Sequence, residues 1–153
     1  MRVFYQCFGR AHSSIAAAHL HLGHLSARGV PSLGEIMALP YFDRSGVEDF
    51  GVPLAFGKDA AGHEIFALGL GMAAPAGLGA IASMFRLAGE EGPLIVDTLS
   101  GLGLLARVGG ALSRQLGLVA LGRPLVAHGL RRAYPRLVET VAGVKRFLEE
   151  VTG

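Results

Sequence analysis

Residues 2–18 constrain the fold of this chain more than any other segment. They pass from an apolar run typical of a buried strand, through a tight polar loop at Gly9, into a helix favoured by Ala16, Ala17 and Ala18. The first backbone N–H groups of such a helix have no partner within it, and the helix dipole adds partial positive charge there. The segment therefore predicts a binding site for an anion, such as a phosphate or a carboxylate.

The composition fits one α/β domain that covers residues 1–153. Hydrophobic residues make up 51% of the chain, charged residues make up 17%, and there are 23 glycines. A chain of this length can bury a core of its own, and the glycines suit tight turns between strands and helices.

Charge and cysteine content indicate which partners and which cellular compartment to expect. The formal net charge is +2 and there is no run of lysine or arginine, so we expect no nucleic-acid partner. The single cysteine, Cys7, excludes an intramolecular disulfide and favours a reducing compartment. Because the chain also enters a strand without a signal-peptide pattern, we expect it in the cytoplasm.

An uncharged run over residues 65–85 is long enough to raise the question of a membrane span. Four glycines and one proline divide this run, so we interpret it as a strand, a loop and a buried helix. We therefore expect no membrane association.

The remaining elements alternate along the chain. Helices are predicted at residues 14–25, 75–87, 102–116 and 135–151, and a short helix at the capping box of Ser32 and Glu35. Strands are predicted at residues 53–56, 63–70, 93–97 and 118–121, the first two forming an antiparallel hairpin. This order indicates a three-layer α/β sandwich with a mostly parallel sheet and helices on both faces.

Polar residues follow three of the predicted strands. They are the loop from Gly9 to Ser14, then Asp97 and Thr98 with Ser100, and then Gly122 and Arg123. Ligands bind beyond the carboxyl ends of parallel strands, so these residues would share one crevice if the strands are neighbours. The alternative is that Ser13, Ser14 and Asp97 only cap helices and that Arg123 lies in a surface turn.

The first loop resembles two known phosphate loops but lacks the key cation of each. In the P-loop motif G-x-x-x-x-G-K-[ST], only Ser14 matches, and Ser13 stands where the lysine would be. In the C-x5-R-[ST] loop of low-molecular-weight tyrosine phosphatases, Cys7 and Ser14 match, and Ser13 replaces the arginine. Arg10 could substitute for it, and Cys7 is either a thiolate of lowered pKa or a small buried hydrophobe.

Histidines crowd the same region, at His12, His19, His21 and His24. Their spacing does not suggest a metal site, and we interpret the helical ones as exposed to solvent. His12 differs because it lies in the anion loop, where it could transfer a proton.

Four motifs are distributed along the chain: GRAHSS at 9–14, PYFD at 40–43, VDTLS at 96–100 and LGLVALGRPLV at 116–126. In these motifs the chain resembles the bacterial family catalogued as domain of unknown function 3189, found mainly in Firmicutes. The resemblance implies one compact cytoplasmic domain and no particular chemistry.

Together these features favour a domain that binds a phosphate-bearing or otherwise anionic small molecule, with phosphoryl-transfer or hydrolase chemistry if it is an enzyme. His12 and Asp97 are the candidate catalytic residues, and a nucleotide or phosphate ligand could bring Mg²⁺ to Asp97. The alternative is a non-catalytic regulatory or scaffolding domain that forms a homodimer. The candidate anion-binding residues are Gly9, Arg10, Ala11, Ser13, Ser14, Ser100 and Arg123.

Overall fold

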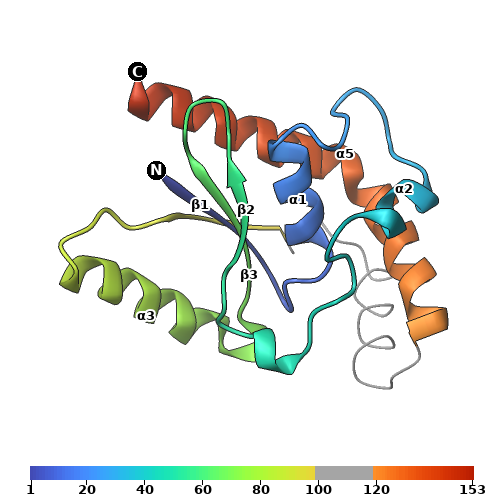
Figure 1. Cartoon of the computed structure of the whole chain (residues 1–153), viewed down its shortest axis with the longest axis horizontal. Coiled ribbons are helices and arrows are strands. Elements are labelled where there is room, and N and C mark those ends of the chain that lie inside the picture. Colours follow the sequence, from blue (N-terminus) through green and yellow to red (C-terminus); the bar gives the residue numbers. More distant parts are fainter. Residues whose placement is uncertain (99–118) are drawn as a thin grey trace.

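A four-stranded sheet forms the middle layer of the molecule (Figure 1). The structure is a computed structural model that describes residues 1–98 and 119–153. In the strand order β2-β3-β1-β4, β1 (Arg2–Cys7) is parallel to both β3 (Glu64–Gly69) and β4 (Leu94–Asp97). Strand β2 (Leu54–Lys58) is antiparallel to β3. The predicted mostly parallel sheet with a hairpin is confirmed.

Alternating side chains of the sheet belong to two separate hydrophobic cores, one on each face. On one face, Val3, Tyr5 and Ile65 pack with α1 (Ser13–His21) and α5 (Val119–Thr152), beside α2 (Leu33–Ala38). On the other face, Phe4 and Leu68 pack with α3 (Ala74–Leu87). This alternation is what a strand buried on both faces requires, and it confirms the predicted three layers.

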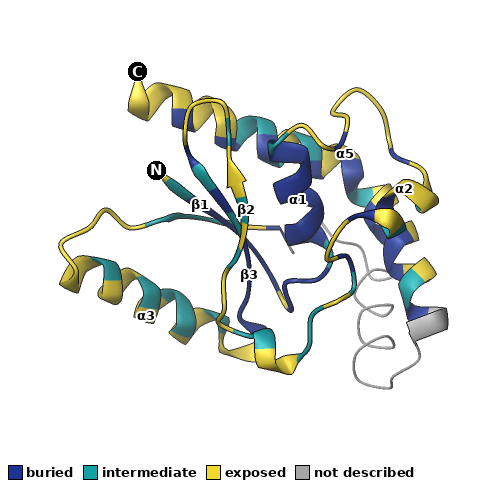
Figure 2. Cartoon of the chain, in the orientation of Figure 1, coloured by how far each residue is buried: buried dark blue, intermediate teal, exposed yellow. Residues whose placement is uncertain are grey.

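The two helical layers are buried to different extents (Figure 2). All nine residues of α1 are buried, whereas no residue of α3 is. Two short 3-10 helices, η1 (Val47–Asp49) and η2 (Gly71–Ala73), lie in the connections. Among the residues described, no helix combines the length and the apolar character needed to cross a bilayer.

The end of the chain differs from its prediction. Residues 119–121 belong to α5, so the predicted strand at 118–121 is wrong in its described part, and the predicted helix at 135–151 is only the second half of α5. A short apolar run fits a strand and a buried helix equally well. Here the helical spacing of buried residues continues to the end of the helix, through Val126, Ala127, Leu130, Tyr134, Leu137, Val141, Val144 and Leu148.

Helix boundaries were predicted with mixed success. The capping box is confirmed, because the Ser32 hydroxyl accepts from Glu35 N–H and the Glu35 carboxylate accepts from Ser32 N–H. Helix α1 ends at His21 rather than at residue 25, shortly before Gly23 takes a φ of 77°. The predicted helix at 102–116 lies outside the described residues.

Gly69 provides a test of how closely the first loop approaches β3. A Cβ at this residue would lie 2.5 Å from the backbone N of Arg10 and 2.6 Å from the carbonyl carbon of Gly9. Because backbone atoms cannot move aside cheaply, Gly69→Ala should lower the free energy of unfolding by about 2 kcal/mol, measured by urea denaturation.

The matched control is Gly79→Ala on α3, where a Cβ would have no heavy atom within 4 Å. Since alanine is the better helix former, this change should raise the free energy of unfolding by roughly 1 kcal/mol. Similar effects of the two substitutions would contradict the steric account.

Candidate functional site

Four segments meet at the carboxyl edge of the sheet, around the loop between β1 and α1. Backbone hydrogen bonds fix this arrangement, with N···O distances of 2.8–2.9 Å: Asp43 N–H donates to Ala11 O, Gly71 N–H to Phe8 O, Gly51 N–H to Gly69 O, and Thr98 N–H to Gln6 O. The β1–α1 loop is therefore enclosed by residues 43–52, by the start of η2 and by the end of β4.

The ends of β1 and β4 converge through hydroxyl groups. Thr98 Oγ1 donates to Gln6 O at 2.8 Å, and Ser13 Oγ lies 2.8 Å from Thr98 Oγ1, so Ser13 is the donor to threonine. Asp97, next to Thr98, pairs in register with Gln6. Two of the three predicted strand ends thus lie side by side, while Ser100 lies outside the described residues.

Neither serine caps α1, contrary to the alternative interpretation. The N-cap residue is His12, and its side chain makes no capping hydrogen bond. The Ser13 hydroxyl donates to Thr98 Oγ1 instead, and Ser14 Oγ lies 3.0 Å from Cys7 Sγ.

Cys7 Sγ collects hydrogen bonds from the loop and the first turn of α1. Burial raises the pKa of the Cys7 thiol, but hydrogen bonds from the Ser14 hydroxyl and from the backbone N–H groups of Ser14, Ala11 and His12 outweigh it. The pKa of Cys7 therefore lies below its ordinary value. The lowered pKa agrees with the first interpretation of Cys7, and the burial of its side chain agrees with the second.

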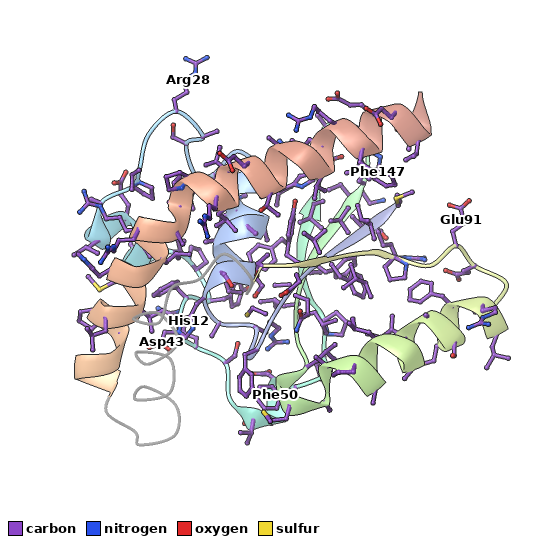
Figure 3. All side chains as sticks on the ribbon, turned by 180° about the vertical axis from the view of Figure 1, so that it is seen from behind. His12, Arg28, Asp43, Phe50, Glu91 and Phe147 are labelled. Atoms are coloured by element: carbon purple, nitrogen blue, oxygen red, sulfur yellow. The ribbon has the colours of Figure 1, made fainter. Side chains whose placement is uncertain are left out.

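A histidine and an aspartate pair beside this loop, as Figure 3 shows from behind. His12 Nε2 donates to Asp43 Oδ1 at 2.8 Å, and the side chains are 12% and 3% exposed. Phe42 packs edge-on against the imidazole, with ring centroids 5.3 Å apart. Sequence reasoning missed Asp43 as a site residue, although its position in the PYFD motif was a signal.

Arg10 has its charge paired within the site. Its backbone has a φ of 55°, and its guanidinium contacts Asp49 Oδ1 at 2.5 Å and donates to Val52 O at 2.7 Å. Ser45 Oγ donates to Arg10 O. Arg10 therefore anchors residues 45–52 to the loop, and its role as an anion ligand stays a prediction.

Arg123 does not lie at a strand end or in a surface turn. It lies inside α5, because the predicted strand before it is helical, and its guanidinium donates to Met37 O of α2 at 2.7 Å. This contact joins the two helices, so Arg123 does not follow a strand end at the crevice as predicted.

Two of the helical histidines were predicted wrongly to be exposed. His19 and His21 are buried, since α1 is covered on all sides. Within residues 1–98 and 119–153 there is no group of three or more histidine, cysteine, aspartate or glutamate residues suited to a metal ion.

The effect of the hydrogen bonds to Cys7 Sγ can be tested by titrating the thiol. Ser14→Ala removes one donor to Sγ and should raise the pKa of Cys7, whereas Ser13→Ala, whose hydroxyl serves Thr98, should leave it unchanged. Thiolate absorbance near 240 nm reports this group alone because the chain has one cysteine. An equal response in both variants would show that Ser14 Oγ does not stabilise the thiolate.

Comparison with known proteins gives a family and no closer relative. No curated protein and no solved structure matches the chain. The family described as "Protein of unknown function (DUF3189)" matches residues 2–146, which include the whole β1–α1 loop, β4 and most of α5. The chain therefore belongs to the DUF3189 family.

Proposed function

We propose that this protein binds a phosphate-bearing or otherwise anionic small molecule at the loop between β1 and α1. The observation that carries the proposal is the convergence of three backbone N–H groups and one hydroxyl on the Cys7 sulfur. Donors arranged to stabilise a thiolate can also stabilise the oxygens of a phosphate or carboxylate.

Arg10 adds a second, independent support. Its side chain is only 9% exposed, and Nε is buried without a hydrogen-bond partner among the described residues. An unsatisfied buried N–H is costly, and an oxygen of a bound anion would supply the acceptor.

We assign proton transfer, if the bound molecule reacts, to His12. Asp43 holds the imidazole through Nε2 and would stabilise its protonated form, as a general acid or base requires. Asp97, beside Thr98 at the end of the neighbouring strand β4, would act as a base or hold Mg²⁺ brought by a nucleotide or phosphate. With serine at residue 13 and Arg10 paired to Asp49, backbone amides carry most of the anion binding.

Ligand-induced stabilisation tests the proposal. A thermal-shift screen against inorganic phosphate, sugar phosphates and nucleotides should find a ligand that stabilises the fold by about 2.7 kcal/mol at one hundred times its Kd. For a domain of this size, that corresponds to roughly 5–10 °C in Tm. Ser14→Ala, which removes one of the four donors, should reduce the shift.

Ser83→Ala is the matched control, because this serine is exposed on α3 and should leave the shift intact. A wild-type protein that melts independently of every anion, and instead self-associates with increasing concentration, would support the alternative of a non-catalytic domain that pairs two copies.

A further inference from the structure

A second cluster of titratable side chains lies at the opposite edge of the sheet. Helix α1 runs back from the carboxyl edge, and its last residue, His21, meets the turn between β2 and β3. The cluster contains Tyr5, His21, Asp59 and His63, of which Tyr5, His21 and His63 are buried. None of these residues contributes to the proposed anion site.

Hydrogen bonds join the four side chains in one line. Tyr5 Oη lies 2.7 Å from His21 Nδ1, and His21 Nε2 lies 3.0 Å from Asp59 Oδ2. His63 Nδ1 lies 3.0 Å from the same carboxylate oxygen. Asp59 Oδ1 accepts from the backbone N–H groups of Ala61 and His63. Asp59 is therefore the point at which the turn is tied to α1 and β1.

The positions of the protons follow from these partners. A carboxylate can only accept, so His21 Nε2 and His63 Nδ1 both donate to Asp59. The neutral His21 ring then has Nδ1 as an acceptor, and the Tyr5 hydroxyl donates to it. In this state every polar atom of His21 is satisfied without a charge on the ring.

We propose that the Tyr5–His21–Asp59–His63 cluster is an acid-released latch, which fixes the β2–β3 turn to α1 while His21 is neutral and opens when His21 takes up a proton. A proton on Nδ1 would face the Tyr5 hydroxyl, which could then no longer donate to the ring. The hydroxyl oxygen would then accept from Nδ1–H, and the hydroxyl proton would lose the only acceptor that it has among the described residues, which is costly in a buried place.

The groups around His21 shift its pKa in opposite directions. Burial lowers the pKa of His21, the hydrogen bond to Asp59 raises it, and the charge of Lys145 on α5 and the neighbouring His63 lower it further. The net shift is downward. Stability that depends on neutral His21 is therefore complete above its unfolded pKa, near 6.5, and is lost as the pH falls below that value.

The carboxylate responds in a separate range of pH. Although burial raises the pKa of Asp59, hydrogen bonds from His21 and His63 lower it well below the ordinary value. Its stabilising contribution is thus lost only in strong acid, below the unfolded value near 3.9. Between about pH 4.5 and 6.5, release of the latch therefore reports protonation of histidine and not of Asp59.

The pKa of His19 is lowered as well, and burial is its largest influence. It forms hydrogen bonds with Pro40 O and His24 and packs against Phe56 of β2, whereas the described hydrogen bonds of Asp59 go to His21 and to residues of the turn. A global stability measurement would mix the two histidines, so the test has to be local.

Hydrogen exchange of the turn provides that local measurement. The protection factors of the Ala61 and His63 amide protons, which donate to Asp59, should fall up to about tenfold between pH 7.5 and 5.5 in the wild-type protein. In His21→Gln they should not depend on pH in this range. The control His128→Gln, at an exposed residue of α5, should behave as the wild type.

Tyr5→Phe gives an independent test should His21→Gln fail to fold. It removes the donor that favours neutral His21, so the midpoint of release should move to higher pH. Protection that is independent of pH in the wild type, that falls equally in His21→Gln, or whose midpoint is unmoved in Tyr5→Phe would overturn the proposal.

Discussion

The structure depends on one constraint, which is that α1 is buried along its whole length although four of its nine residues are polar. A polar group in such a place is costly unless it is hydrogen-bonded. Ser13 is satisfied by Thr98, Ser14 by Cys7, and His21 by Tyr5 and Asp59. These contacts join α1 to the end of β4, to β1 and to the hairpin. The partners that allow the helix to be buried therefore also form the candidate site around Cys7 and the Tyr5–His21–Asp59–His63 cluster.

The parts of the fold that carry local signals could be predicted from the sequence. The first strand is a short apolar run before a tight loop, the hairpin has a turn at residues 58–62, and the capping box has its characteristic spacing. The approach of Thr98 to Ser13 could also be predicted, because parallel neighbouring strands end at the same edge of a sheet.

The parts of the structure that depend on partners distant in the sequence could not be predicted from it. His21 was predicted to be exposed because the spacing of residues shows which face of a helix is apolar, but not that the opposite face is covered as well. Asp43 was missed because it reaches His12 across 31 positions, from a backbone with a φ of 57° that no local pattern indicates. Arg123 was misplaced because residues 118–121 fit a strand and a helix alike.

The two ends of α1 show how burial and the helix dipole combine. At the N-terminus the dipole and the free N–H groups favour a negative charge, and there hydrogen bonding outweighs burial, so the pKa of Cys7 is lowered. At the C-terminus the dipole favours a positive charge on His21, yet the pKa of His21 is lowered as well, because burial dominates. Hydrogen bonding at the first turn of the helix thus favours the charged form of Cys7, whereas burial at its last turn favours the neutral form of His21.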